Sequence, residues 1–277
     1  MAEYGGVKSA WLQLLPGWRA GSALSECCEL GQGSGGEVWR CSTSQGSWVV
    51  KQHLHEDTAI DLQRMQQLQN LAAQHGLAPR IVTIDMRNGV EVAEWLPGVV
   101  ATVADFAQPE YLQSVAQRLG ELHRIPVPSA WAARTDWQFD ILRHVQLRWS
   151  RLQARTDTAA HAQLAVRVSE APAQLAAIQD RPRPPSLLHL DAHAGNLLAS
   201  DALVLLDWEY ACLGNPIWDL ASLLAPLPLD EHLGLQVIRA AGRQRDTNWR
   251  QLQTARELFM LLSELWSVER AAPAGAG

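Results

Sequence analysis

Short runs of apolar and β-branched residues, separated by turn residues, dominate about the first hundred residues and predict strands. The strand candidates are Ser25–Leu30, Glu37–Cys41, Ser47–Gln52, Arg80–Asp85 and Val90–Leu96. One helix interrupts them, because apolar residues recur at helical spacing over Ile60–His75 and Gly76 follows as a stop. The pattern therefore predicts a β-rich N-terminal region with one helix.

After Pro97-Gly98 the spacing of apolar residues becomes helical. The predicted helices are Tyr111–His123, Trp137–Leu152, Ala159–Ile178 and a last stretch that continues to about Glu269. Two short apolar segments, Leu187–Leu190 and Leu203–Leu206, each lie beside a polar cluster. We expect an α+β chain with a small β-rich lobe over residues 1–97 and a larger, mainly helical lobe over residues 98–277.

Composition and charge narrow the class of protein. A hydrophobic content of 47% with 19% charged residues is typical of a folded globular chain. The formal net charge of −6 gives no global field that would favour nucleic acid or an anionic membrane as partner. No signal peptide and no apolar run of the roughly 18 residues needed to cross a membrane is evident. We expect a cytoplasmic protein whose cysteines, 27, 28, 41 and 212, are reduced thiols.

The strongest chemical signal is the run His189-Leu190-Asp191-Ala192-His193-Ala194-Gly195-Asn196, followed by Leu205-Leu206-Asp207-Trp208-Glu209. Phosphoryl transfer needs a carboxylate that accepts a hydroxyl proton and oxygen ligands that hold Mg²⁺ on the phosphates. Asp191 suits the first task, and Asn196 and Asp207 suit the second.

The pattern H-x-D-x-x-x-x-N, then an apolar strand and D-W-E, resembles the aminoglycoside phosphotransferase and choline kinase superfamily, whose fold is similar to that of protein kinases. The run HLDAHAGNLL…LLDWEYA resembles bacterial thiamine kinases and choline or ethanolamine kinases in particular. The resemblance implies ATP and Mg²⁺ as cofactors, Asp191 as catalytic base, and Asn196 and Asp207 as metal ligands. It also implies that His189 braces the catalytic loop and that Asp219 buttresses it. On this resemblance, the lobe over residues 1–97 binds the nucleotide, and the lobe over residues 98–277 is catalytic and binds the substrate.

The N-terminal region has the order strand, glycine turn, strand and lysine that kinases use. Glycines allow backbone N–H groups to approach phosphates closely, and Lys51 would pair with the α- and β-phosphates. The resemblance places adenine against hinge backbone groups near Glu94-Trp95-Leu96-Pro97. The predicted nucleotide-binding residues are Gly31, Gly33, Ser34, Gly35, Lys51, Glu94 and Leu96.

One departure from the kinase pattern concerns the acid that orients the lysine. Kinases place a Glu on the helix after the lysine strand, yet Ile60–His75 contains none. Asp61, Glu56 or the neutral Gln66 could take this role, and the sequence leaves the choice open.

The aromatic composition bears on the chemical nature of the second substrate, because the chain has 12 Trp but only three Phe and three Tyr. Trp offers the best π-face for an organic cation, although Trp at helical spacing is more often core. A pocket for a cationic alcohol could draw on Trp208, Glu209, Trp218, Glu257 and Trp266. Thiamine and choline both carry a hydroxyl and a cationic group, and the similarity of the motifs favours thiamine slightly.

Other classes compete with this interpretation. The chain could be an aminoglycoside or amino-sugar kinase, or a pseudokinase that binds ATP without turnover. A protein kinase fits poorly because HRDL, DFG and APE are absent, and a P-loop enzyme fails because no GxxxxGK[ST] exists. The sequence therefore predicts an ATP-dependent kinase that phosphorylates a hydroxyl of a small molecule.

Overall fold

The structure is a computed structural model that describes residues 8–19, 26–33, 36–53, 61–155, 161–178, 184–228 and 230–271. The chain divides into two compact units. Unit 1 comprises Met1–Ala101 and Gly195–Ala211, and unit 2 comprises Thr102–Ala194 and Cys212–Gly277. The sequence predicts one boundary after residue 97, whereas Gly195–Ala211 returns to the first unit.

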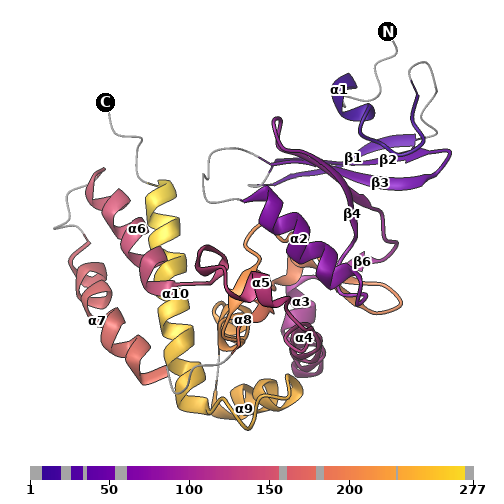
Figure 1. Cartoon of the computed structure of the whole chain (residues 1–277). Coiled ribbons are helices and arrows are strands. Elements are labelled where there is room, and N and C mark those ends of the chain that lie inside the picture. The colour runs from indigo at the N-terminus through magenta and orange to yellow at the C-terminus, as the bar shows by residue number, and fades with distance from the viewer. Residues whose placement is uncertain are drawn as a thin grey trace. The chain divides into compact units, whose positions relative to one another are not determined.

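Unit 1 is built on a five-stranded antiparallel sheet in the order β1-β2-β3-β5-β4 (Figure 1). Its strands are β1 (Glu26–Gly33), β2 (Gly36–Thr43), β3 (Gly46–Gln52), β4 (Ile81–Asp85) and β5 (Val90–Glu94). Helix α2 (Leu62–Ala73) contacts β4 and buries Met65, Leu68 and Ala72. The predicted strands and helix of this region are confirmed, with ends that shift by a few residues.

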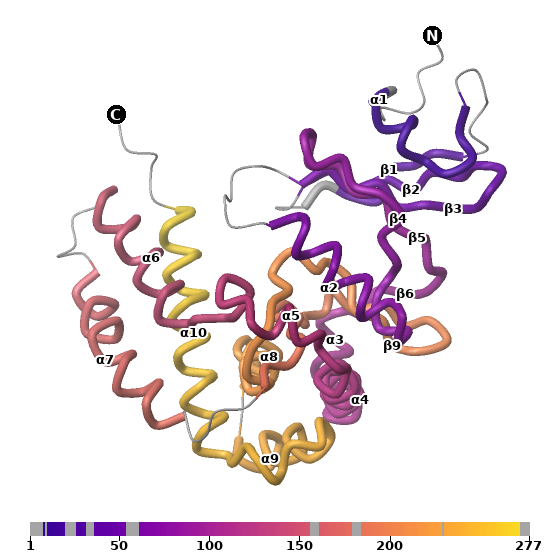
Figure 2. The backbone as a smooth tube through the Cα atoms, in the orientation of Figure 1, coloured from indigo at the N-terminus to yellow at the C-terminus, as the bar shows by residue number. Residues whose placement is uncertain are grey.

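Gly195–Ala211 belongs to unit 1 because its strands pair with the strand that follows the five-stranded sheet. The three-stranded sheet β6-β8-β9 joins β6 (Val99–Val100), β8 (Leu197–Ala199) and β9 (Leu203–Leu205), and Figure 2 shows β6 and β9 together. The N–H of Ala101 donates to the carbonyl of Leu197 at 2.8 Å. A Cβ at Gly98 would lie 2.5 Å from the carbonyl oxygen of Ala199, so glycine permits this close approach.

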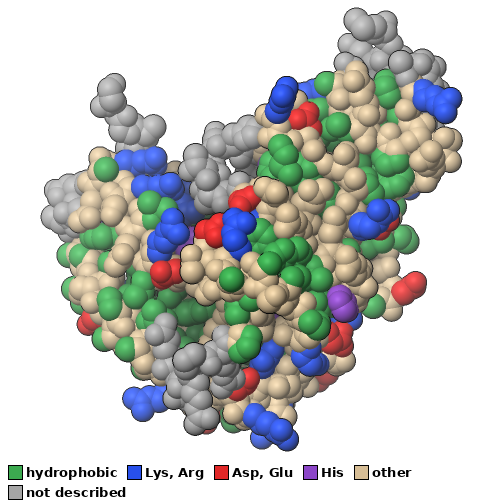
Figure 3. Space-filling model, in the orientation of Figure 1, with side chains coloured by type: hydrophobic (Ala, Val, Ile, Leu, Met, Phe, Trp, Pro, Cys, Tyr) green, Lys and Arg blue, Asp and Glu red, His purple; other side chains and the backbone are tan. Residues whose placement is uncertain are grey.

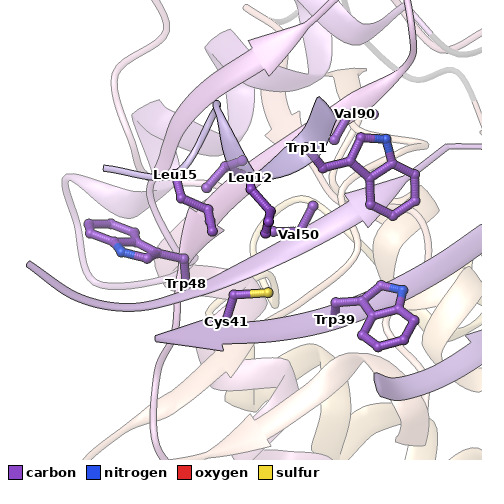
Figure 4. Packing of buried hydrophobic residues seen from close by; sticks show 9 residues of the cluster. Trp11, Leu12, Leu15, Trp39, Cys41, Trp48, Val50 and Val90 are labelled. Carbon is purple, nitrogen blue, oxygen red and sulfur yellow. The ribbon is translucent and has the colours of Figure 1, made fainter. Parts of the chain in front are cut away.

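A hydrophobic cluster covers one face of the five-stranded sheet (Figure 4). Trp11 and Leu12 of α1 (Ser9–Leu12), with Leu15, pack there, a contribution that the sequence pattern did not predict. Their partners on the strands are Trp39, Cys41, Trp48, Val50, Val90 and Val92. Because side chains alternate along a strand, burial of Trp48 and Val50 in this cluster directs Lys51 to the opposite face of the sheet.

Two cysteines in unit 1 differ from the expectation of reduced thiols. Cys27 of β1 and Cys41 of β2 are cross-strand partners joined by a disulfide. Cys28 and Cys212 are free. The expectation is wrong for Cys27 and Cys41, because strand register brings together cysteines that no local spacing marks as a pair.

Unit 2 is mainly helical. Its helices are α3 (Val103–Phe106), α4 (Pro109–Leu122), α5 (Ser129–Ala132), α6 (Ile141–Gln153), α7 (Ala162–Ile178), α8 (Ile217–Leu224), α9 (Glu231–Ala240) and α10 (Trp249–Ala271). Helix α10 packs against α6, α7 and α8 (Figure 1). Strand β7 (Ser186–Leu188) pairs antiparallel with β10 (Cys212–Gly214). The predicted α+β class, with strands first and helices afterwards, is confirmed.

The surface matches a chain of modest net charge. Acidic, basic and apolar side chains are interspersed over the face shown in Figure 3. Among the described residues, no helix combines the length and the apolar character that crossing a bilayer requires.

A test of packing in unit 2 follows from Gly120 on α4. A Cβ there would lie 2.4 Å from the backbone carbonyl oxygen of Ala241, at the end of α9. We expect Gly120→Ala to lower the free energy of unfolding by about 1–3 kcal/mol, because backbone cannot move aside as a flexible side chain can. Urea unfolding measures the loss. The control is Ser114→Ala on the exposed face of α4, expected to change stability by less than about 0.5 kcal/mol; equal stabilities of the two variants would contradict this packing.

Candidate active site

The turn that presents Asp191 has an uncommon backbone conformation. Leu190, directly before Asp191, has a φ of 65° although it is not glycine. Such a residue persists only where its surroundings hold it, and these conformations concentrate at functional sites. The Oγ of Ser222 donates to the carbonyl of Leu190 at 2.8 Å, so α8 fixes one side of this turn.

Asp219 of α8 fixes the other side. Its carboxylate accepts from the N–H of Leu190 at 2.7 Å and from the N–H of His189 at 3.1 and 3.2 Å. Its side chain is fully buried. Asp219 therefore satisfies two backbone donors that β7 leaves unpaired at its end, as the buttress role implied by the resemblance requires.

Behind Asp219 lies His123, a residue that the sequence interpretation missed. Its Nε2 is 2.8 Å from Oδ2 of Asp219, and both side chains are 0% exposed. Burial lowers the pKa of His123, against the opposing attraction of the Asp219 carboxylate. A neutral imidazole whose Nε2–H donates to Asp219 fits this geometry. The position, a histidine after the last residue of α4, looks like any helix end in the sequence, so no local signal marks it.

Asp191 itself is held by its neighbours and remains partly exposed. Its N–H donates to Nδ1 of His189 at 3.2 Å, which is the contact expected of a residue that braces the loop. Its carbonyl accepts from the N–H of His193 at 3.0 Å, and Nε2 of His193 lies 3.4 Å from its carboxylate oxygen Oδ2. The side chain of Asp191 is 29% exposed, so a solvent-borne hydroxyl can reach a carboxylate whose backbone is fixed.

Asp207, in unit 1, also has a left-handed backbone, with a φ of 59°. The preceding N–H, of Leu206, donates to the carbonyl of Asn196 at 2.8 Å, which ties the Asn196 segment to the Asp207 segment. The indole of Trp208 is 1% exposed and donates to the carbonyl of Leu205 at 2.9 Å. Trp208 therefore anchors the turn that carries Asp207.

Lys51 reaches this turn from β3. Its Nζ lies 2.6 Å from Oδ1 of Asp207 and 3.9 Å from Oε2 of Glu209. Burial by itself would lower the pKa of Lys51, but the carboxylates of Asp207, Glu209 and Glu91 outweigh it and raise the pKa above its ordinary value. These contacts therefore favour the charged form of Lys51, which lies on the central strand of the sheet.

The donor set near Asp207 fits a magnesium ion. Asn196, which is 7% exposed, offers a carboxamide oxygen, and Asp207 offers a carboxylate whose side chain is 31% exposed. In the described ranges no group of three or more His, Cys, Asp or Glu is arranged to hold a metal. Mg²⁺ in kinases is held by one or two protein oxygens together with the substrate phosphates, so a set of two oxygen ligands is suitable.

The structure describes some, but not all, of the other predicted nucleotide-binding residues. Gly31 and Gly33 belong to β1, beside the turn into β2, whereas Ser34 and Gly35 lie outside the described residues. At the predicted hinge, the N–H of Glu94 donates to the carbonyl of Arg80 at 2.9 Å. Leu96 follows β5 and is half-buried. The roles of these residues in binding adenine or phosphate stay predictions.

Of the three residues predicted to orient Lys51, Asp61 has another contact: it accepts from the N–H of Arg64 at 3.0 Å and caps α2. Glu56 lies outside the described residues, and the role of the neutral Gln66 stays a prediction. The carboxylates near the Lys51 ammonium belong to Asp207 and Glu209. Both residues lie far from Lys51 in the sequence. This pairing could not be read from the helix pattern.

The five residues proposed for the second substrate are divided between the units. In unit 1 Trp208 is core, so its ring offers no open face, and Glu209 lies near Lys51. In unit 2 Trp218 is 5% exposed and packs edge-on against Phe139. Arg270 already covers the ring of Trp266, and Glu257 is exposed on α10. For Trp208 the substrate assignment is corrected: its indole stabilises the Asp207 turn.

Comparisons with known proteins identify the family of this chain. The model of the phosphotransferase enzyme family matches residues 26–254. A thiamine kinase from Shigella boydii is 29% identical over 182 residues, which cover 64% of this chain and 58% of that protein. The match therefore spans less than two thirds of the length of this relative.

Solved structures show the same fold. A choline kinase from Streptococcus pneumoniae superposes with a TM-score of 0.71 at 16% identity, over 90% of this chain and 86% of that one. A choline/ethanolamine kinase family protein from Mesorhizobium loti gives 0.72 at 20% identity, over 95% and 84%. These likenesses confirm the predicted protein-kinase-like fold class.

Proposed function

Because the chain belongs to the phosphotransferase enzyme family, we propose that it transfers the γ-phosphoryl group of ATP to a hydroxyl of a small molecule. The proposal is supported mainly by two turns with an uncommon backbone conformation. Asp191 directly follows Leu190, whose backbone is left-handed, and the backbone of Asp207 is itself left-handed. Two carboxylates on backbone that costs free energy to maintain are expected at a catalytic site.

In the proposed reaction, Asp191 orients the acceptor hydroxyl and takes its proton as the oxygen bonds to the γ-phosphorus. The bond from the γ-phosphorus to the bridging oxygen of ADP breaks, and ADP carries the electron pair away. Asp191 then releases the proton to solvent. Asp219 and His189 keep the backbone of Asp191 in place throughout, because they bond the N–H groups of residues 189 to 191.

Lys51 would neutralise charge on the α- and β-phosphates. Asn196 and Asp207 would hold Mg²⁺, which supplies electrostatic stabilisation of the transferred group when it is bound. Lys51, Asp207 and Glu209 together carry a net charge of about −1 at neutral pH, since one ammonium faces two carboxylates. That surplus favours a cation beside the phosphates.

Thiamine is the acceptor that we propose first, because the curated relatives of this chain are named thiamine kinases. Choline and ethanolamine share the combination of a hydroxyl with a cationic group. Aminoglycosides and amino sugars also offer hydroxyl and ammonium groups and belong in the same trial.

A panel of acceptors tests the proposal. Purified protein with Mg²⁺ and ATP is incubated with thiamine, choline, ethanolamine, an aminoglycoside or an amino sugar, and ADP release is measured. We expect one class to raise ADP release well above the rate with ATP alone. ATP binding without acceptor-dependent release for any of them would instead favour a non-catalytic nucleotide-binding module.

The metal ligand assignment yields a separate prediction. Asp207→Asn should weaken the binding of Mg²⁺-ATP by about 10- to 100-fold, because a charged ligand and the nearest anion of Lys51 are lost together. Calorimetric titration with and without Mg²⁺ measures the effect, and Asp201→Asn, on the exposed turn between β8 and β9, is the matched control. An unchanged Mg²⁺ dependence in Asp207→Asn would remove Asp207 from the metal site.

A further inference from the structure

The ammonium of Lys51 lies close to two carboxylates that enter from the same turn. Oδ1 of Asp207 is 2.6 Å away and Oε2 of Glu209 is 3.9 Å away, with all three residues in unit 1. The side chains of Lys51 and Glu209 are each 12% exposed, whereas that of Asp207 is 31% exposed. Glu209 is therefore the more deeply buried of the two anions.

The proposed function gives Asp207 a second task, because it would also hold the metal ion. A divalent cation and an ammonium that share one carboxylate repel each other, and the repulsion is strong at short range in a partly buried site. Lys51 would then need another anion to keep it extended toward the phosphates. A Lys side chain left without a fixed partner samples many rotamers, which costs free energy when it must bind.

The described part of the helix after β3 does not supply that anion. Helix α2 carries no acidic residue along Leu62–Ala73, and Asp61 is used as its N-cap. Glu91 is the cross-strand partner of Lys51 on β5, but its Oε2 is 2.9 Å from Nε2 of the buried His53. Glu91 thus acts on Lys51 from a longer range, while its closest contact is with the histidine.

We propose that Glu209 is the positioning residue that holds Lys51 in its phosphate-binding orientation when Asp207 ligates the metal. This inference rests on the proposed function. It assigns to a residue of the DWE turn the task for which kinases use a glutamate on the helix after the lysine strand. It also explains why a carboxylate is buried beside Lys51, since burial of a charge is costly unless an opposite charge is close.

Two other roles for Glu209 make different predictions. A carboxylate that recognised a cationic acceptor would act on the acceptor KM and would not depend on Lys51. A carboxylate that ligated the metal would act only when Mg²⁺ is present, and would act whether or not Lys51 is there. A carboxylate that positions Lys51 acts on ATP binding most strongly when Mg²⁺ occupies Asp207, and only while Lys51 is there.

A double-mutant cycle separates these roles. ATP affinity is measured by calorimetric titration, with and without Mg²⁺, for the wild type, Glu209→Gln, Lys51→Met and the double variant. We expect Glu209→Gln to weaken Mg²⁺-ATP binding about tenfold when Lys51 is present, because a close and partly buried anion is lost, and less than about twofold in the Lys51→Met background. Glu209→Asp, which keeps the charge on a shorter side chain, should recover part of the affinity.

The controls make each outcome decisive. Glu29→Gln, an exposed carboxylate of β1 in the same unit, should leave ATP affinity unchanged. Circular dichroism and the thermal midpoint of each variant show whether it is folded, and a misfolded Glu209→Gln is replaced in the cycle by Glu209→Asp. Equal losses in the wild-type and Lys51→Met backgrounds, or no loss for Glu209→Gln in the presence of Mg²⁺, would overturn the assignment. Wild-type protein that bound no ATP at all would contradict the proposed function itself, and this inference with it.

Discussion

Replacing Asp191 with Asn is expected to slow turnover by about 10²–10⁴-fold while ATP affinity stays within about twofold of the wild type. The reason is that the carboxylate is proposed to act on the acceptor hydroxyl and not on the nucleotide. The amide has the same shape and keeps the backbone contact from the N–H of residue 191 to Nδ1 of His189, so the turn should keep its form. Steady-state ADP release and calorimetric ATP titration measure the two quantities.

Asp201→Asn is the matched control for this prediction. It removes one carboxylate from an exposed turn and should leave both turnover and ATP affinity unchanged. Turnover of the Asp191→Asn protein at a rate close to that of the wild type would show that Asp191 is not the base. A loss of ATP affinity as large as the loss of turnover would show instead that the substitution disturbs the nucleotide site.

The largest effect on stability is expected for Asp219→Ala. Its carboxylate accepts from two backbone N–H groups and contacts the buried His123, so its removal leaves three polar groups of unit 2 without their acceptor. Each buried hydrogen-bonding group left without a partner costs about 1–3 kcal/mol, so the free energy of unfolding should fall by about 3 kcal/mol or more. Urea unfolding followed by circular dichroism measures the change.

A surface aspartate provides the comparison. Asp230 caps α9 and accepts from one backbone N–H, that of Leu233 at 2.8 Å. Asp230→Ala should cost only about 1 kcal/mol, the usual value of an N-cap. If Asp219→Ala lost no more stability than Asp230→Ala, the buried network would not be what holds the Asp191 turn. We also expect Asp219→Ala to lose turnover, because Leu190 would then relax from its left-handed conformation.

Sequence patterns predicted those helices and strands whose conformation is determined by residues close together in the sequence. The β-branched run around Lys51 and the apolar spacing of the α2 region each favour one conformation, and the structure confirms both elements. The candidate catalytic motif could also be recognised, because Asp191, Asn196 and Asp207 lie in short segments whose spacing resembles that of a known family.

Features that depend on contacts between distant segments could not be predicted. The disulfide between Cys27 and Cys41 follows from the β1–β2 register, and the return of Gly195–Ala211 to unit 1 follows from β6–β8 pairing. His123 gains its role from Asp219, 96 residues further along the chain. A sequence pattern reports on neighbours along a helix or strand, so such partners remain hidden until the chain is folded.

The tryptophans illustrate the same limit. Their abundance suggested a cation pocket, but Trp208 is buried by the turn that it supports, and Trp11, Trp39 and Trp48 fill the unit 1 cluster. Composition counts the aromatic rings and cannot tell which of them keep an open face. The acceptor is therefore better identified by chemistry than by the number of tryptophans.

Direct observation of the transferred group tests the central claim most closely. ATP labelled with ¹⁸O on its γ-phosphoryl group is incubated with the protein, Mg²⁺ and thiamine, or the acceptor that the panel selects, and the products are analysed by mass spectrometry. The account predicts a phosphate ester of the acceptor that carries the label, formed by the wild type and strongly reduced for Asp191→Asn. Label found only in inorganic phosphate, or an ester formed equally well by both proteins, would contradict it.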